Sequence, residues 1–413
     1  MKPSHYQTLS TSELLADHSW FNRRLFSAVL KRLPELEYGT LDLELPNGQQ
    51  IQFGKAREGE PRAEIRLNSF RPLKRLLTGG QLGMAESYMA GEWDSPDLVS
   101  LVCWALGNEQ RMPDLSDGKL WLRTLNRILH WRRANTKRGS RRNIAYHYDL
   151  GNDFYQLWLD PSMTYSSALF TTPELSLNEA QEEKYRRIAT LLDLKPGQTV
   201  LEVGCGWGGF AELAAKEFGV KVEGITLSRE QLIFAQERIK KAGLDSLCRF
   251  SLTDYRDVIG TYDHIVSIEM FEAVGEENWS TYFQTLKKRL KPGGRAVLQV
   301  ISIDDNRFDS YRKNPDFIQR YIFPGGMLPS PERLQHSLEQ QGLQLEQSQF
   351  FGLDYAQTLA IWRHQFIEQW PRIQTQGFDE RFRRMWLYYL AYCEGGFRYK
   401  AIDVGFYQLT HSE

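Results

Sequence analysis

The chain has 413 residues, of which 41% are hydrophobic and 25% are charged, and this composition excludes a disordered or collagen-like protein. The 51 Lys and Arg residues are balanced by 52 Asp and Glu residues, for a net charge of -1, which argues against a globally basic nucleic-acid-binding protein. Because a single hydrophobic core rarely grows past about 250–300 residues, we expect two domains.

The cysteines and the N-terminus indicate the cellular compartment in which the protein works. The four cysteines form no CxxC pair, and no histidine lies at metal-ligand spacing from them, so we expect neither a disulfide framework nor any metal site. The N-terminus lacks the apolar core of a signal peptide, and no apolar run approaches the roughly 18 residues that span a bilayer. We therefore expect a cytoplasmic protein whose membrane contact, if it has one, is peripheral.

The first region, residues 1–118, has mixed patterns. Apolar residues over 12–33 recur mostly at steps of four, which predicts an amphipathic helix. Two runs with alternating apolar residues, 41–45 and 51–53, then flank Asn47-Gly48, which predicts a β-hairpin. This region is expected to form a small α+β domain.

Residues 119–142 contain nine basic residues and no acidic one, with leucines and Trp131 interleaved at roughly helical spacing. A basic amphipathic segment of this kind suits an anionic membrane surface. A solvated linker between domains explains the same composition equally well. The phosphates of a nucleic acid would also match these charges, but no predicted fold feature supports that partner.

Residues 143–413 are predicted to alternate strands with helices. A helix over 180–194 ends at Pro196-Gly197, and apolar strands follow at 199–203, 221–226, 264–268 and 295–301, the last after a turn at 291–294. Alternation of this kind indicates a parallel, doubly wound sheet.

A glycine loop carries the strongest chemical signal. The strand at 199–203 leads into Gly204, Gly206 and Gly208, and a helix over 210–218 follows. Such loops allow a tight turn and let a ligand approach the backbone, and alone they suggest a dinucleotide. However, Glu202 lies where it can meet a cationic amine, and the second strand has no acidic residue at its end to bind a ribose. The loop therefore favours S-adenosylmethionine over a nicotinamide cofactor or an empty turn.

After the second strand, Ser228 and Gln231 match the S-x-x-Q capping box of a helix start. A structural role thus competes with ligand binding at these two residues.

Six stretches of the sequence, two of them described above, match motifs of one family. They are His147–Asn152, Met163–Ser166, Val203–Gly209, Thr226–Gln231, Tyr321–Gly326 and Gly395–Arg398. The sequence resembles the cyclopropane-fatty-acyl-phospholipid synthases, including the mycolic acid cyclopropane synthases, from about Arg71 to the C-terminus. The stretch Leu82–Tyr88 resembles the N-terminal domain of full-length bacterial members. The resemblance implies a Rossmann-like class I methyltransferase fold for 143–413, preceded by a smaller, lipid-binding-like α+β domain.

The resemblance also implies a reaction. The family uses S-adenosylmethionine to add a methylene group across a cis double bond of an unsaturated phospholipid. The alkene attacks the sulfonium methyl group, and a base, a bound bicarbonate in family members, then takes a proton so that the ring closes. Aromatic rings suit the positive charge that develops. Further implied features are action at the inner face of an anionic membrane and assembly as a homodimer.

The resemblance implies roles for individual residues that match functional positions of the family. Glu272 matches the glutamate that holds bicarbonate, and Ile301 and Tyr355 match two further residues around the anion. Cys393 matches a cysteine once proposed as catalytic, but the alkene is the nucleophile, so a structural role is favoured. The residues expected to contact the cofactor are Tyr165, Ser166, Glu202, Gly204, Cys205, Gly206, Gly208, Thr226, Leu227, Ser228, Gln231, Asp254 and Tyr255.

The chain departs from the family pattern at the anion site. Ser167 stands where many bacterial members have Cys, Gln299 where they have His, and Glu269 where they have Gly. Ser and Gln still hydrogen-bond anions, and plant members resemble this chain here. We therefore hypothesise a rebuilt site in which Glu269 acts as a substitute base.

Three other functions compete with ring formation. A weakened base site would instead yield a methyl-branched unsaturated chain, as in relatives of the furan fatty acid pathway. A methyltransferase acting on a polar acceptor would need an acceptor motif such as Asn-Pro-Pro-Tyr, which the sequence lacks. A non-catalytic lipid-binding or cofactor-sensing protein is disfavoured by the presence of Glu272, Tyr355 and the glycine loop.

Overall fold

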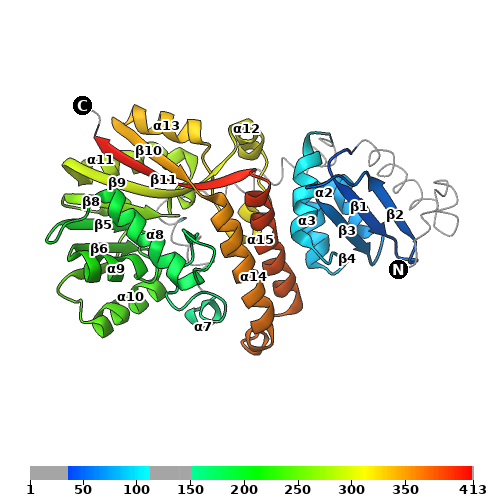
Figure 1. Ribbon diagram of the computed structural model, residues 1–413, viewed down its shortest axis with the longest axis horizontal. Helices are drawn as coiled ribbons and strands as arrows, with labels where there is room; N and C mark the ends of the chain where they lie inside the picture. The colour runs from blue at the N-terminus through cyan, green and yellow to red at the C-terminus, as the bar shows by residue number, and fades with distance from the viewer. Residues whose placement is uncertain (1–35, 112–138, 140–149, 412–413) are drawn as a thin grey trace. The chain divides into compact units, whose positions relative to one another are not determined.

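The computed structural model describes residues 36–111, 139 and 150–411 (Figure 1). These residues form two compact units, one of residues 36–111 and 377–399, the other of residues 139, 150–376 and 400–411. The helix predicted over 12–33, the predicted domain boundaries at 118 and 142, and the basic segment apart from Gly139 lie outside the described residues.

The first unit is the expected α+β fold. Its sheet has the strand order β2-β1-β3-β4. The predicted hairpin is confirmed, because β1 (Thr40–Glu44) and β2 (Gln50–Gly54) pair antiparallel around Gly48, which has a φ of 81°. The remaining elements are β3 (Arg62–Leu67), α2 (Arg71–Met89), β4 (Trp93–Asp94), α3 (Leu98–Asn108) and the short η2 (Glu109–Arg111).

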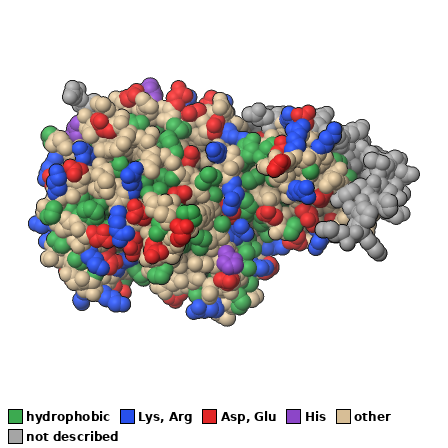
Figure 2. All heavy atoms as spheres, viewed as in Figure 1, with side chains coloured by type: hydrophobic (Ala, Val, Ile, Leu, Met, Phe, Trp, Pro, Cys, Tyr) green, Lys and Arg blue, Asp and Glu red, His purple; other side chains and the backbone are tan. Residues whose placement is uncertain are grey.

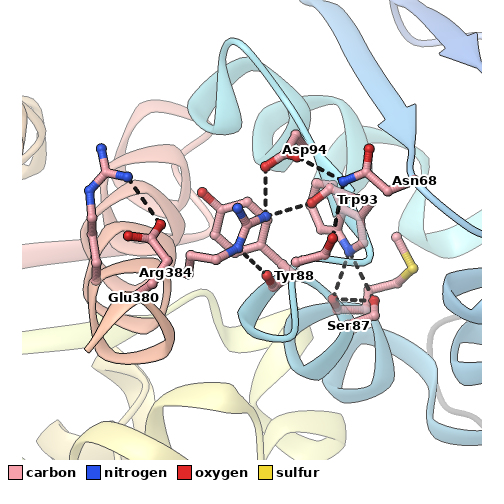
Figure 3. A network of polar contacts seen from close by, with 10 residues as sticks. Asn68, Ser87, Tyr88, Trp93, Asp94, Glu380 and Arg384 are labelled. Atoms are coloured by element: carbon pink, nitrogen blue, oxygen red, sulfur yellow. Dashed lines mark hydrogen bonds and ion pairs between the residues drawn. The ribbon is translucent and has the colours of Figure 1, made fainter.

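A helix from the far end of the sequence, α15 (Glu380–Arg398), completes this unit. Arg384 donates hydrogen bonds to Asp94 (2.7 Å) and to the carbonyls of Tyr88 (2.5 Å) and Trp93 (2.6 Å) (Figure 3). Its guanidinium lies 4.2 Å from the centre of the Tyr88 ring. One partly buried cation thus joins α15 to the ends of α2 and β4.

The second unit is built on a seven-stranded sheet with the order β10-β11-β9-β8-β5-β6-β7. Strands β5 to β9 are parallel, and β11 pairs antiparallel with β9 and β10. The strands are β5 (Thr199–Val203), β6 (Lys221–Thr226), β7 (Cys248–Leu252), β8 (Tyr262–Ile268), β9 (Leu290–Ile303), β10 (Leu343–Phe350) and β11 (Ile402–His411).

Helices cover both faces of this sheet (Figure 1). They are α7 (Asn152–Tyr155), α8 (Leu177–Leu192), α9 (Gly209–Phe218), α10 (Arg229–Ala242), α11 (Trp279–Arg289), α12 (Asp305–Lys313), α13 (Pro331–Gln340) and α14 (Gly352–Thr375), with short turns η3 (Tyr255–Asp257), η4 (Phe271–Ala273), η5 (Glu276–Asn278) and η6 (Ile318–Ile322). One apolar core joins α11 and α13 to Leu201 and Val203 of β5. Since side chains alternate along a strand, Glu202 between them points to the opposite face.

The sequence predictions for this unit are largely confirmed. Strands β5 and β6 have the predicted ends, and the parallel, doubly wound arrangement is present. The predicted turn at 291–294 lies inside β9, where the register with β8 jumps from Tyr262↔Leu290 to His264↔Arg295. The turn therefore forms a bulge within one long strand.

The described residues can be compared with the patterns of charged surfaces, membrane-spanning helices and metal sites. Acidic and basic side chains are interspersed on the face that Figure 2 shows. None of the described helices combines the length and the apolar character that crossing a bilayer requires. No group of three or more potential metal ligands occurs among the described residues.

Candidate active site

The candidate site lies at the carboxyl ends of the parallel strands. The chain leaves β5 toward β6 and β7 on one side, and β8 and β9 extend the sheet on the other side. Ligands of doubly wound sheets bind at the point where the strand order reverses. Gly204, Thr226 and Glu269 end or follow β5, β6 and β8 at this edge, so the structure brings together residues that are distant in sequence.

The glycine loop requires its glycines. Gly204, Gly206 and Gly208 have φ angles of 85°, 50° and 83°, where residues with a side chain are strained. A Cβ at Gly204 would also lie 2.8 Å from Cγ of Met270. The N–H of Gly204 donates to the carbonyl of Ile225 at 3.0 Å. The loop is therefore held against β6, and a ligand can reach its backbone.

The Cys205 side chain is buried and points back into the fold. Burial holds the pKa of its thiol well above the usual value, so the thiol stays neutral and unreactive. Any contact that Cys205 makes with a cofactor would come from its backbone.

The buried carboxyl group of Glu202 shows whether the site fits S-adenosylmethionine. Its side chain is buried, and its Oε2 accepts no hydrogen bond from the described residues. Burial raises the pKa of this carboxyl well above its usual value, and the nearby cations Arg238 and Lys184 lower it only in part. A buried acceptor without a donor is costly. A cationic amine or a hydroxyl group of the cofactor would satisfy it, so these residues fit the cofactor.

The turn after β6 has a structural role in addition to any binding role. Ser228 is the N-cap of α10 and accepts a hydrogen bond from the Gln231 backbone at 3.3 Å, as predicted. The second bond of the predicted capping box is absent, because Oε1 of Gln231 accepts a hydrogen bond from Thr226 at 2.9 Å instead. Leu227 lies between these polar side chains and is partly exposed.

Asp254 and Tyr255 follow β7 at the same edge of the sheet. The buried carboxylate of Asp254 accepts hydrogen bonds from the Arg256 guanidinium at 2.7 Å. Burial raises the pKa of Tyr255 to about 12, so its phenol stays neutral and can donate or accept a hydrogen bond.

Tyr165 belongs to an aromatic cluster. Its ring centre lies 5.4 Å from that of Tyr155, 5.5 Å from Trp158 and 5.3 Å from Trp362. The side chains of Tyr155, Trp158 and Trp362 are fully buried. Aromatic faces attract cations in such dry surroundings. The structure thus gathers aromatic rings around Tyr165, and stabilisation of a positive charge there stays a prediction.

The predicted anion site contains a carboxyl group of the chain itself. Oε1 of Glu269 accepts hydrogen bonds from the Ser167 backbone N–H (2.8 Å) and from Nε2 of Gln299 (2.7 Å). Its Oε2 accepts a hydrogen bond from the Tyr355 hydroxyl at 2.7 Å. The hydroxyl of Ser167, which we had expected to serve the anion, donates to the Ala168 carbonyl. These donors are taken, so the arrangement does not fit a separate bicarbonate.

Glu269 adopts this position with a strained backbone. Its φ is 49°, in the left-handed region that residues other than glycine rarely occupy. Such strain costs roughly 1 kcal/mol or more and gathers at functional sites. The resemblance implies glycine at this position, so the backbone has kept a glycine-like conformation while the side chain fills the anion site.

Glu272 lies beside Glu269 in a different protonation environment. Its Oε1 accepts a hydrogen bond from the Ile301 N–H at 2.6 Å, and its buried Oε2 has no partner among the described residues. Burial, and next the charge of Glu269, raise the pKa of Glu272 to about 8. Burial also raises the pKa of Glu269, but its three donors and Lys184 oppose that rise. Neighbouring carboxyls with such different environments typically divide acid and base roles.

One predicted residue lies elsewhere, and one buried residue was missed. Cys393 is on α15 and therefore belongs to the first unit, whereas the other predicted site residues belong to the second. Lys184 of α8 is fully buried and donates to Oγ of Ser166 at 2.6 Å. Its spacing of four from the buried Ile188 placed it on the inward face of the predicted helix, which was the available signal.

Comparison with known proteins places the chain in a family. Residues 135–407 match the family described as mycolic acid cyclopropane synthetase. This range includes α15, although that helix folds with the first unit.

Two curated relatives match most of the chain. The cyclopropane-fatty-acyl-phospholipid synthase of Escherichia coli K12 is 39% identical over 363 residues, which cover 87% of this chain and 90% of the relative. The tuberculostearic acid methyltransferase UfaA1 of Mycobacterium tuberculosis is 38% identical over 360 residues, covering 82% and 80%.

Solved structures agree with the class I methyltransferase fold. The cyclopropane synthase MmaA2 from Mycobacterium tuberculosis aligns with a TM-score of 0.62 at 31% identity, covering 65% of this chain and 97% of that chain. The mycolic acid cyclopropane synthase CmaA1, complexed with SAH and CTAB, also has a TM-score of 0.62, at 32% identity and with the same coverage. This chain is therefore a member of the mycolic acid cyclopropane synthetase family, a group of S-adenosylmethionine-dependent methyltransferases.

Proposed function

We propose that this protein is a cyclopropane-fatty-acyl-phospholipid synthase that converts a cis double bond of an unsaturated phospholipid acyl chain into a cyclopropane ring. The Escherichia coli enzyme of that name supports the assignment, since the match covers 87% of this chain and 90% of the relative. The observation that carries the chemistry is the Glu269 carboxylate, which lies among three hydrogen-bond donors beside the aromatic cluster of Tyr165.

Bound S-adenosylmethionine would supply an electrophilic methyl group for the alkene. The predicted cofactor-contacting residues, from Tyr165 and the glycine loop to Asp254 and Tyr255, would hold it at the carboxyl ends of β5 to β7. Glu202 would accept a hydrogen bond from the cofactor's ammonium group, because its buried carboxylate has an oxygen that lacks a donor.

The aromatic cluster would protect the cationic acyl chain that results. When the π electrons of the alkene form the new carbon–carbon bond, one alkene carbon becomes electron-deficient and would react with water. Tyr165 and Trp362 present aromatic rings in a buried environment, which stabilises a cation and excludes water.

Glu269 would then act as the base. A proton of the transferred methyl group moves to the Glu269 carboxylate, and the electron pair of that C–H bond closes the three-membered ring. The hydrogen bonds from Gln299 and Tyr355 hold the carboxylate in one orientation and favour its charged form. Glu272, with a pKa of about 8, stays protonated near neutral pH and adds no second negative charge.

We extend the proposal to the place of action. The substrate lies in a bilayer, so the enzyme would work peripherally at the inner face of the membrane. The basic segment 119–142 would attract anionic headgroups, and the catalytic domain would assemble as a homodimer, as the resemblance implies.

Product analysis tests the proposal. Purified protein is incubated with methyl-labelled S-adenosylmethionine and vesicles of cis-unsaturated phospholipid, and the acyl chains are analysed by mass spectrometry and NMR. We expect a labelled cyclopropane, and no label in vesicles of saturated phospholipid. A labelled methyl-branched alkene, which has the same mass, would contradict ring formation. Cofactor binding without any transfer would instead indicate a sensor.

A further inference from the structure

Lys184 is a buried cation without a carboxylate partner. It lies on α8 with a fully buried side chain, and its Nζ donates one hydrogen bond, to Oγ of Ser166 at 2.6 Å. Among the described residues, no Asp or Glu carboxylate lies within ion-pair distance of Nζ. An ammonium group has three donors, and burying it without a counter-ion is costly. Nζ also lies 4.7 Å from the centre of the Tyr185 ring, so the described residues around it supply one neutral hydrogen-bond acceptor and one aromatic ring but no counter-ion.

The position of this cation is at the edge of the sheet where the cofactor binds. Ser166, its partner, precedes Ser167, whose N–H donates to Glu269 after β8. Burial lowers the pKa of Lys184 to about 7, and the charges of Glu269, Asp160 and Glu202 oppose that decrease. Lys184 therefore lies within electrostatic reach of the carboxyl ends of both β5 and β8.

The charges at this edge match a zwitterion. The amino-acid end of S-adenosylmethionine carries one ammonium and one carboxylate group. Glu202 offers a buried carboxylate without a donor, which suits the ammonium. Lys184 offers a buried amino group whose one hydrogen bond goes to a neutral hydroxyl and which has no counter-ion in the described part of the chain; this suits the carboxylate. Neither side chain has a partner of opposite charge within bonding distance among the residues that the structure describes, so the bound cofactor would supply a partner to each.

We propose that Lys184, together with the Ser166 hydroxyl, binds the carboxylate of S-adenosylmethionine and so selects a cofactor with an intact amino-acid end. This inference deepens the proposed function and rests on the cofactor that it uses. It does not depend on whether the product is a ring.

A comparison of two ligands tests this role by binding alone. Decarboxylated S-adenosylmethionine lacks only the carboxylate, so calorimetric titration of both compounds isolates that group. In Lys184→Met we expect the affinity for S-adenosylmethionine to fall by about 10- to 100-fold, as for loss of a hydrogen-bonded charge. The affinity for the decarboxylated compound is expected to change by less than about threefold, which is within the range of a surface substitution.

Tyr185→Phe is the matched control. Tyr185 is the next residue of α8, and its hydroxyl shares a hydrogen bond of 2.8 Å with Thr164, two residues before Ser166. This variant loosens the same segment without removing a charge, so it should not discriminate between the two ligands. Equal losses for both ligands in Lys184→Met would mean that Lys184 only supports the fold, and unchanged binding of both would likewise overturn the proposal.

A second variant covers the case in which Lys184→Met does not fold. Ser166→Ala removes the hydroxyl that Lys184 contacts, and it should weaken binding of S-adenosylmethionine more than binding of the decarboxylated compound. If it weakens both equally, the proposal is wrong. Failure of the wild-type protein to bind either compound would instead contradict the proposed function, so the two failures are distinguishable.

Discussion

At Glu269 the backbone and the side chain have opposing preferences. The φ of 49° is costly for a residue with a Cβ, whereas the carboxylate gains hydrogen bonds from Ser167, Gln299 and Tyr355. Hydrogen bonds to a charged group contribute about 1.5–3 kcal/mol each, and they oppose both the strain and the burial that raises the pKa of this carboxyl. The residue is therefore held by its side chain in a conformation that its backbone alone would not choose.

The neighbouring Glu272 gives a pH-dependent prediction. Its pKa rises from the usual 4.5 to about 8 in the folded state, so between these values the folded state binds more protons than the unfolded state. The Glu272 contribution to the free energy of unfolding therefore decreases as the pH rises from about 4.5 to 8, by at most about 1.4 kcal/mol per pH unit.

The variant Glu272→Gln cannot ionise and should lack this contribution. Urea unfolding of both proteins at several pH values from 5 to 8 measures it as a difference, in which the other titrating groups cancel. The wild type should lose stability relative to Glu272→Gln as the pH rises. Parallel curves for the two proteins would show that Glu272 has an ordinary pKa.

The sequence predicts the place of some site residues but not their contacts. The extra carboxylate Glu269 is predicted to lie near the anion site, because it stands three residues before Glu272 in the motif that the resemblance identifies. That it would occupy the donors itself was only a hypothesis, since the left-handed φ and the distances depend on the tertiary fold. Lys184 was missed because lysines are rarely buried.

At the scale of elements, Arg384 makes the polar attachment of α15 to α2 and β4. Arg384 contacts two backbone carbonyls, the Asp94 carboxylate and the Tyr88 ring. Arg384→Ala removes all of these contacts at once, although Asn68 still donates to Asp94 and the Gly91 N–H still donates to the Tyr88 carbonyl. We expect a loss of about 2–4 kcal/mol in the free energy of unfolding. Denaturant unfolding monitored by tryptophan fluorescence measures the change.

Arg381→Ala is the control on the same helix. Arg381 is exposed, so its removal should change the free energy of unfolding by less than about 0.5 kcal/mol. An equally small effect of Arg384→Ala would show that the network of Figure 3 does not hold α15 in place.

Elements with local signals were predictable, and those that depend on distant contacts were not. The strand β5 lies between Pro196-Gly197 and Gly204, and β6 begins shortly after Gly219 and ends before the helix start at Ser228. The predicted ends of both strands agree with the structure. The placement of α15 in the first unit depends on a contact between residues 290 positions apart. No local pattern of the sequence encodes such a contact.

At the scale of the whole molecule, the basic segment is the predicted link to the bilayer. We predict that reversing four of its charges, Arg132, Arg133, Arg141 and Arg142 to Glu, weakens binding to anionic vesicles by at least about tenfold, since each basic residue near such a surface contributes about 1 kcal/mol. Sedimentation with vesicles at low and high salt measures the binding, and vesicles of neutral lipid serve as the control. Unchanged binding to anionic vesicles would exclude the segment as a membrane contact.

Turnover in buffer depleted of carbon dioxide shows whether Glu269 is the base. The wild type should modify vesicles of cis-unsaturated phospholipid at full rate without bicarbonate, because Glu269 occupies the donors itself. Glu269→Gly, which suits the φ of 49°, frees those donors. It should be inactive until bicarbonate or acetate is added, whereas Glu269→Gln fills the site with a neutral amide and should stay inactive. A wild type that requires added bicarbonate, or a Glu269→Gln variant with full activity, would show that Glu269 is not the base.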